Sequence, residues 1–129
     1  MKHLATFEAA AQTIGIDPAQ LPIVSHLPEQ LQKAPVALYK LSVISAAAWH
    51  KEGVKMNWND WSQKKYYAWW NMSSNDESVG SASGFSFSVY YYDDSFSRVG
   101  SRLVFPTRKA LEYVAKTHYD LYRDIFVID

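Results

Sequence analysis

The chain of 129 residues has no cysteine, no excess of charge and no long run of apolar residues. Without cysteine, disulfides and thiolate metal sites are excluded, and the redox compartment stays undetermined. Thirteen basic residues balance thirteen acidic ones, so no overall charge draws the chain to nucleic acid or to an anionic membrane. No stretch approaches the roughly 18 apolar residues of a transmembrane helix. The first residues, MKHLATFEAAAQTIGID, lack the apolar run of a signal peptide. We therefore expect a cytoplasmic or virion-associated protein that makes no contact with a membrane.

Signatures of catalysis are missing as well. The sequence has no nucleophile elbow, phosphate-binding loop or glycine-rich dinucleotide fingerprint. His50 and Glu52 are two residues apart, so they do not face each other on a helix, and the histidines form no metal-binding pattern. Asp93 and Asp94 are adjacent and therefore diverge, whereas an acid and base pair must converge on one substrate atom. We expect no catalytic residue, metal site or cofactor, and hence a non-enzymatic protein.

Aromatic residues are abundant instead. They make up 16% of the chain, with five tryptophans and nine tyrosines, within a hydrophobic fraction of 48%. Such a composition is typical of a folded globule, and the length fits one domain. The order of patterns described below predicts a single α+β domain spanning residues 1–129.

The N-terminal half predicts two helices. The first covers Thr6–Thr13, and Gly15 supplies its C-terminal stop. A connector interrupted by prolines leads to a second helix from Pro28 to about Glu52, which is apolar on most sides and therefore central. Pro35 lies inside this span and removes one backbone hydrogen bond, so we expect a kink or a fresh start there.

The C-terminal half predicts a three-stranded antiparallel meander with strands at Tyr66–Met72, Gly84–Tyr92 and Val99–Phe105. The loop Ser73–Ser83 between the first two strands is rich in serine, glycine and asparagine. The second strand alternates in polarity, which predicts that one set of side chains faces inward and the next set outward. The inward set is Phe85, Phe87, Val89 and Tyr91, and the outward set is Ser86, Ser88, Tyr90 and Tyr92.

The third strand leads directly into a closing helix that we expect to pack on the sheet. Pro106 stops the strand pairing because it has no N–H group, and Thr107 suits the helix N-cap. A stripe with helical spacing follows, made of Leu111, Val114, His118, Leu121 and Ile125. Within this stripe, His118 is predicted to be a hydrogen-bonded core residue.

The first candidate site is an aromatic face on the sheet, opposite the closing helix or near it. Its residues are Trp58, Trp61, Tyr66, Trp70, Tyr90 and Tyr92. Exposed rings of this kind stack on sugars or on bases, which predicts a binding module for glycan or single-stranded nucleic acid. Alternatively, the central helix covers this face, or the face is a subunit interface, where tyrosine and tryptophan are enriched. Packing or self-association is the favoured alternative, because monomers rarely leave large apolar patches open.

The second candidate site is basic. Arg98 and Arg102 are predicted on one face of the last strand, with Arg108 and Lys109 in the first turn of the helix that follows. Cations at a helix N-terminus oppose the helix dipole, so their presence can mark an anion site. The alternative is a solvated edge that pairs with nearby carboxylates. Together with the aromatic face, the arginines would form a platform for single-stranded nucleic acid.

Three segments carry a resemblance to known proteins: NWNDWSQKKYYAWW, SGFSFSVYYYDDSF and VGSRLVFPTRKALEYVAKTHYDLYRDIF. With TFEAAAQTIGIDP and the ALYKL helix, the chain resembles a group of short uncharacterised proteins of gut bacteria and of the phages and mobile elements that infect them. In this group a YYxWW-like segment, a GFxF strand and a VGSRLxF strand leading into a helix recur in that order. The resemblance implies a phage or prophage context and no catalytic residues. Our leading hypothesis is therefore an interaction or assembly protein that acts through its aromatic sheet face and self-associates.

Overall fold

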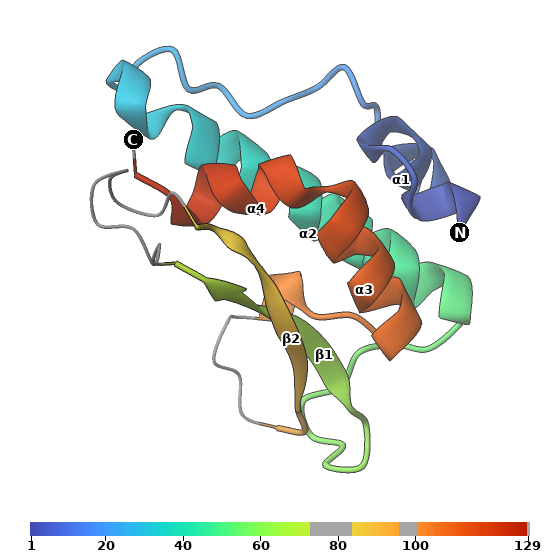
Figure 1. Ribbon diagram of the computed structural model, residues 1–129. Coiled ribbons are helices and arrows are strands. Elements are labelled where there is room, and N and C mark those ends of the chain that lie inside the picture. Colours follow the sequence, from blue (N-terminus) through green and yellow to red (C-terminus); the bar gives the residue numbers. More distant parts are fainter. Residues whose placement is uncertain (73–83, 96–100, 129) are drawn as a thin grey trace.

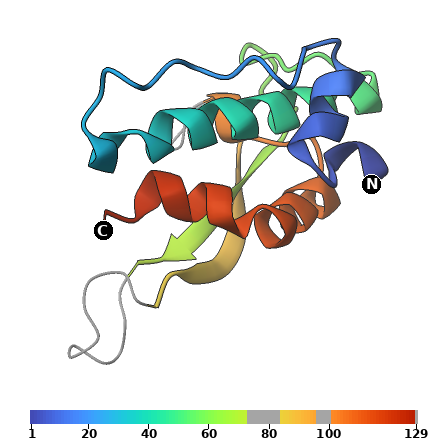
Figure 2. The ribbon, with the colours of Figure 1, turned by 90° about the horizontal axis from the view of Figure 1, so that it is seen from above.

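The computed structural model describes residues 1–72, 84–95 and 101–128. Within these residues, four α-helices lie on one side and a two-stranded antiparallel sheet lies on the other (Figures 1 and 2). The predicted α+β class is thus confirmed. The predicted loop at 73–83 and the beginning of the predicted third strand at 99–100 lie outside the described residues.

Both predicted N-terminal helices are present, but the second begins at Lys33 and not at the predicted Pro28. Helix α1 (Phe7–Thr13) begins at the N-cap Thr6, whose hydroxyl accepts a 3.0 Å hydrogen bond from the backbone N–H of Ala9. A short 3₁₀ turn, η1 (Lys2–Leu4), precedes it. Just after α1, Gly15 adopts a left-handed φ of 74°, which only glycine takes without strain, so the chain turns away there.

Helix α2 (Lys33–Glu52) is the central element and packs against both α1 and the C-terminal helix α4. A separate 3₁₀ turn, η2 (Glu29–Leu31), comes before it, so Pro35 falls in the first turn of α2. There its missing N–H removes no intrahelical hydrogen bond, and the predicted fresh start is confirmed. The buried apolar residues of α2 are Ala37, Leu41, Val43, Ile44, Ala47, Ala48 and Trp49.

Strand β1 (Lys65–Asn71) pairs with strand β2 (Ser86–Asp93), as predicted for the first two strands. The register slips between two neighbouring residues of β1. Trp69 lies opposite Val89, whereas Trp70 lies opposite Phe87, so Ser88 is an extra residue in β2. This is a β-bulge, and it reverses the phase of side-chain alternation along β2.

The bulge overturns part of the predicted alternation. Tyr90 and Tyr92 lie on the same face as Phe87, toward the helices, although the sequence predicted them to point outward. Val89 and Tyr91 lie on the opposite face, where they are 41% and 44% exposed, although they were predicted to point inward. The strict period of two fails at Ser88, because a bulge adds one residue to one strand only.

The predicted third strand is wrong for its described residues. Ser101–Leu103 form a 3₁₀ turn, η4, and Phe105 alone pairs with the sheet, through two backbone hydrogen bonds of 2.9 and 2.8 Å to Tyr66. The carbonyl of Val104 accepts from Ser45 Oγ at 2.6 Å and Trp49 Nε1 at 2.9 Å, both on α2. Side chains of a helix therefore bind this carbonyl in place of a neighbouring strand.

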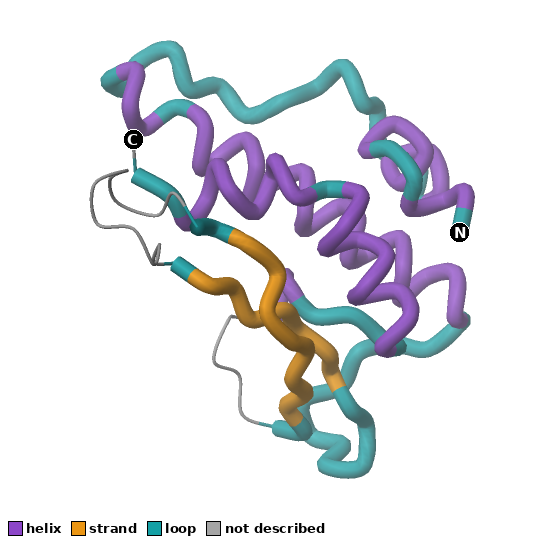
Figure 3. The backbone as a smooth tube through the Cα atoms, viewed as in Figure 1, coloured by secondary structure: helices purple, strands orange, loops and turns teal. Residues whose placement is uncertain are grey.

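The closing helix is divided in two. Thr107 caps α3 (Arg108–Thr117), as predicted, by accepting a 3.1 Å hydrogen bond from the N–H of Ala110. The helix is interrupted at His118, where Figure 3 shows a short loop segment, and continues as α4 (Tyr119–Phe126). His118 Nε2 lies 2.7 Å from the carbonyl oxygen of Leu4, so the predicted hydrogen-bonded histidine is confirmed.

Helices α3 and α4 run antiparallel to α2 and cover one face of the sheet (Figures 1 and 2). Leu111 and Val114 of the predicted stripe are completely buried. The interruption at His118 turns the stripe, so that Tyr122 is the buried residue of α4, while Leu121 and Ile125 are only partly buried. The helices therefore position the sheet with one face inward and one face open.

Candidate functional site

The sheet has two unlike faces, which follow from the register and from the alternation of strand side chains. We call the face toward α3 and α4 the covered face. Its residues are Tyr66, Ala68, Trp70, Phe87, Tyr90 and Tyr92. We call the opposite face the open face. Its residues with described side chains are Lys65, Tyr67, Trp69, Asn71, Ser86, Val89 and Tyr91.

Trp70 is the centre of the covered face. Its ring stacks on Phe85 with centroids 4.8 Å apart and planes 9° apart, and it lies 4.8 Å from the ring of Tyr122. Phe87 and Tyr119 contact it at 5.7 and 5.9 Å. Trp70 therefore belongs to the hydrophobic core, which corrects its predicted place on a binding face.

The predicted tyrosines of the aromatic face also lie on the covered side. The ring of Tyr66 is 5.9 Å from the rings of both Tyr90 and Tyr92. Tyr66 and Tyr90 are partly buried against the core, whereas Tyr92 is 47% exposed at the end of the strand, with Lys64 Nζ 4.5 Å from its ring centroid. The predicted position opposite the closing helices is therefore wrong for these three residues.

The two remaining predicted aromatics lie in the loop before β1 and not on the sheet. Trp58 is partly buried against a small second core of Trp49, Tyr67 and Val104. Trp61 is 61% exposed. The six predicted residues thus occupy a core, a strand end and a loop, and they do not form one surface.

Lys65 connects this loop to the sheet. Its ammonium group donates to the backbone carbonyls of Asp60 at 3.2 Å, Gln63 at 2.9 Å and Asp94, and it lies 4.9 Å from the ring centroid of Trp58. Burial lowers the pKa of Lys65, and the negative charges of Asp60 and Asp94 oppose that shift. With its donors occupied, Lys65 offers no cation to a ligand on the open face.

The open face exposes three large apolar side chains. Trp69 is 44% exposed, Val89 41% and Tyr91 44%, and the ring centroids of Trp69 and Tyr91 are 4.6 Å apart. Tyr67 lies beside them, buried, with its ring stacked against Tyr91. We call Trp69, Val89 and Tyr91 the open patch. Sequence analysis did not select any of the three, although the alternation of YYAWW places one tryptophan on each side of β1.

The outer edge of β2 adjoins the open patch. Among residues 1–72, 84–95 and 101–128, β2 pairs with β1 alone. From Ser86 to Tyr92 the strand contains no lysine, arginine or proline, the residues that commonly protect a sheet edge from pairing. Within the described strand, the features that can hinder pairing are the bulge at Ser88 and the charged residue Asp93 at its end. This edge can therefore accept another strand.

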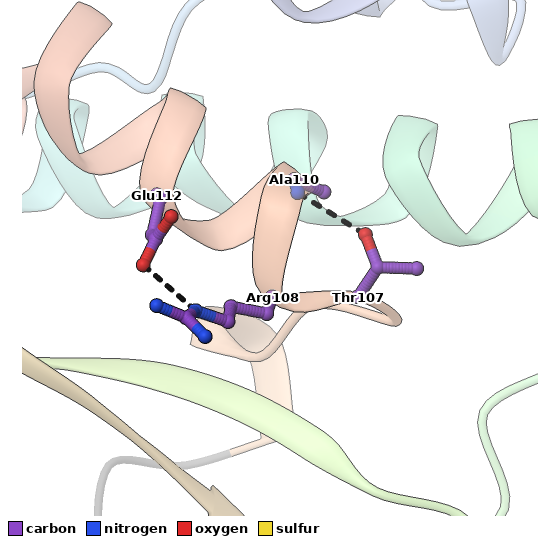
Figure 4. A network of polar contacts seen from close by, with 4 residues as sticks. All are labelled: Thr107, Arg108, Ala110 and Glu112. Atoms are coloured by element: carbon purple, nitrogen blue, oxygen red, sulfur yellow. Dashed lines mark hydrogen bonds and ion pairs between the residues drawn. The ribbon is translucent and has the colours of Figure 1, made fainter.

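The predicted anion site does not assemble from its described members. Arg108 forms an ion pair with Glu112 at 3.0 Å (Figure 4), and its guanidinium lies 4.6 Å from the ring centroid of Tyr90. The hydrogen bond and the charge of Glu112 raise the pKa of Arg108. Arg102 and Lys109 are exposed, and Arg98 lies outside the described residues. The alternative of pairing with a nearby carboxylate thus holds for Arg108.

The described residues offer few features of other kinds of site. Within the described part of the chain, no helix has the length and apolar character needed to cross a bilayer. In the same residues, no group of three or more histidine, aspartate or glutamate side chains is placed to hold a metal ion. No protein-family model matches the chain, and comparison with curated proteins and with solved structures also gives no match. The open patch and the edge beside it are the strongest candidate site.

Proposed function

We propose that this protein is a non-enzymatic interaction protein that assembles with a second copy of itself through the open patch and the outer edge of β2. The observation that carries the proposal is the exposure of Trp69, Val89 and Tyr91 on one face of a sheet whose other face packs against the helices. A phage or mobile-element origin, which the resemblance of the chain implies, fits a role in assembly.

Burial of the open patch is the source of binding energy in this proposal. Each apolar square ångström removed from water contributes about 25 cal/mol, and tryptophan and tyrosine dominate the energetics of many interfaces. Trp69 and Tyr91 already contact each other at 4.6 Å, so little side-chain freedom is lost when a partner covers them. The patch is therefore preorganised for an apolar partner surface.

The second copy is the occupant that the strand edge favours. Two β2 strands related by a two-fold axis pair antiparallel, so each copy contributes the same surface. Their sheets then join into one of four strands, in which Val89 and Tyr91 of each copy pack beside the side chains of the other copy's β2 and are partly buried by them. Two-stranded sheets are marginal in water, and additional strands stabilise them. Because β2 has no charged side chain from Ser86 to Tyr92, no like charges oppose this pairing.

Single-stranded nucleic acid and glycan are less well supported as ligands. Rings alone can stack on bases, but strong binding also requires cations for the phosphates. On the open face, the only cation among the described side chains is Lys65, whose donors are occupied by carbonyls. A glycan needs no cation, so glycan binding is the outcome to test if self-association fails.

Sedimentation velocity over a range of protein concentrations tests the proposal. We expect the wild-type chain to dimerise, and the variants Trp69→Thr and Tyr91→Lys to remain monomeric at the same concentrations. Trp61→Thr is the matched control, because it removes an exposed indole from the loop before β1. A wild-type chain that stays monomeric near millimolar concentration contradicts the proposal. Titration with oligosaccharides, and with single-stranded oligonucleotides at two salt concentrations, then tests the other ligands.

A further inference from the structure

A second surface, distinct from the open patch, is a groove along the C-terminal half of α2. Its volume is about 800 Å³, which falls in the range of about 300–1,000 Å³ that small-molecule sites occupy. Ile14 at the end of α1 forms one side, Val54 and Met56 form another, and Ala46 and Trp49 of α2 lie along it. These apolar side chains come from three separate segments of the chain, which the fold brings together.

The polar groups in the wall of the groove are already engaged. Ser45 Oγ and Trp49 Nε1 both donate to the carbonyl of Val104, and Ser42 Oγ donates to the carbonyl of Leu38 at 2.7 Å. A ligand in the groove therefore meets a surface that behaves as apolar, even where serine and tryptophan contribute to it. Specificity has to come from the remaining polar residues.

Those remaining residues are all basic. His50, Lys55 and Arg102 line the groove, all three are exposed, and no aspartate or glutamate is among the lining residues. Among the described residues, neither Lys55 nor Arg102 forms an ion pair with a carboxylate. In a chain with balanced total charge, the groove thus combines an apolar interior with basic side chains that form no ion pair within the described residues.

We propose that this groove binds an amphipathic organic anion, a carboxylate or sulfonate attached to an apolar aliphatic or aromatic body. The apolar body lies against Ile14, Ala46 and Met56, and the anionic group meets Arg102 and Lys55. Arginine suits this role because its guanidinium donates two parallel hydrogen bonds to a carboxylate. A neutral molecule of the same shape gains the apolar contacts but leaves both cations without a partner.

Two naphthalene dyes separate these contributions. 1-Anilinonaphthalene-8-sulfonate is anionic, and N-phenyl-1-naphthylamine has the same ring system without the sulfonate; both fluoresce more strongly in apolar surroundings. We expect the anionic dye to bind the intact protein more tightly, and decanoate to displace it at concentrations where decanol does not. Equal affinity for the two dyes would overturn the proposal.

Variants locate the site. The double variant Lys55→Gln and Arg102→Gln is expected to bind the anionic dye about tenfold or more weakly, as the loss of charge-assisted hydrogen bonds predicts, with unchanged affinity for the neutral dye. Lys33→Gln together with Lys109→Gln is the matched control, because it removes two exposed lysines that do not line the groove. Ala46→Trp fills the groove from an exposed position of α2 and should abolish the binding of both dyes.

The open patch is the competing place for such dyes, and Trp69→Thr tests it. If this variant abolishes binding while the groove variants leave it unchanged, the dye binds the sheet and the proposal is overturned. Circular dichroism spectra and melting curves verify that each variant is folded, and Ala46→Ser serves as the conservative substitution at the same position. Because no sheet residue lines the groove, this result is independent of whether the chain dimerises.

Discussion

The two faces of the sheet carry the same kinds of side chain, but one face packs against helices and the other exposes large rings to solvent. Trp69 and Trp70 are neighbours in β1, yet Trp69 is 44% exposed while Trp70 stacks on Phe85 at 4.8 Å and contacts Tyr122 of α4. What separates them is the layer formed by α3 and α4, which covers the face on which Trp70 lies. For Trp69 and Trp70, the parity of the position in β1 thus decides whether the ring packs against the core or stays exposed.

The bulge at Ser88 makes this division consistent across both strands. Without the bulge, Phe87 and Tyr91 would lie on the same face. Either Phe87 or the pair Tyr90 and Tyr92 would then point away from the helices. With it, Tyr90 joins Trp70 on the covered face, and Tyr91 joins Trp69 on the open face. One extra residue in β2 therefore places a ring of β2 beside a ring of β1 on each face of the sheet.

The largest expected effect is the loss of stability when the covered face is emptied. Trp70→Ala should lower the free energy of unfolding by about 3–5 kcal/mol, because it removes a large side chain from a packed core. Trp69→Ala should cost about 1 kcal/mol or less, the range of a single cross-strand pair. Urea denaturation at low protein concentration measures both. Equal losses would show that the two faces do not differ.

A substitution at Tyr122, which contacts Trp70, is expected to raise the free energy of unfolding. The hydroxyl of Tyr122 is buried and has no hydrogen-bond partner among the described residues. Tyr122→Phe should therefore raise the free energy of unfolding at neutral pH by about 1–3 kcal/mol, since the cost of an unsatisfied polar group disappears. Urea denaturation of the two proteins at pH 7 measures this difference, and a loss of stability would contradict it.

The same substitution has a predictable pH dependence. Burial raises the pKa of Tyr122 above its usual value. Above about pH 10 the unfolded chain releases the phenolic proton while the folded chain retains it, so this residue's contribution is complete below that pH and is lost as the pH rises. We expect the wild type to lose stability more steeply than Tyr122→Phe in alkaline solution. Parallel slopes would contradict the burial of the hydroxyl.

A smaller loss of stability is expected at the N-terminus of α3, the helix that begins the layer over the covered face. Thr107→Ala removes the 3.1 Å hydrogen bond to Ala110 at the start of α3 and should cost about 1 kcal/mol. Thr117→Ala is the matched control, because Thr117 is an exposed threonine at the other end of the helix. Thermal denaturation should separate the two variants, with the lower midpoint for Thr107→Ala. The reverse order would contradict the capping role shown in Figure 4.

The smallest effect belongs to the rim of the covered face. Arg108 is exposed, pairs with Glu112 at 3.0 Å and lies over Tyr90, so solvent and salt screen most of its interactions. Arg108→Gln should lower the melting midpoint less than Thr107→Ala does, and added salt should reduce the difference from the wild type. Lys109→Gln, one residue away, provides the baseline for removal of an exposed charge.

Local signals in the sequence predicted the helices well. Helix ends depend on a few neighbouring residues: Thr107 caps α3 as predicted, and Gly15 adopts a left-handed conformation where the first helix was predicted to stop. The prediction of the third strand was wrong because the carbonyl of Val104 bonds to residues that are distant in the sequence. Ser45 and Trp49 of α2 bind the carbonyl of Val104, and no pattern near residue 104 reveals partners more than fifty positions away.

The candidate site was harder to predict than the fold. An exposed aromatic sheet face was predicted with Trp70 and Tyr90 on it, whereas the structure buries these two partly and exposes Trp69 and Tyr91. Both choices fit the segment YYAWW, since each face of β1 receives rings. Deciding between them requires the bulge at Ser88 and the position of the helix layer, and both are products of tertiary packing.

Hydrogen exchange of the β2 amides at two protein concentrations tests the central claim most directly, because it observes the proposed interface itself. If the outer edge of β2 joins a second copy, the amides of Ser86–Asp93 that do not bond to β1 should exchange more slowly at high concentration, and Tyr91→Lys should abolish that change. Exchange rates that are independent of concentration, in a chain that is monomeric throughout, would contradict the claim.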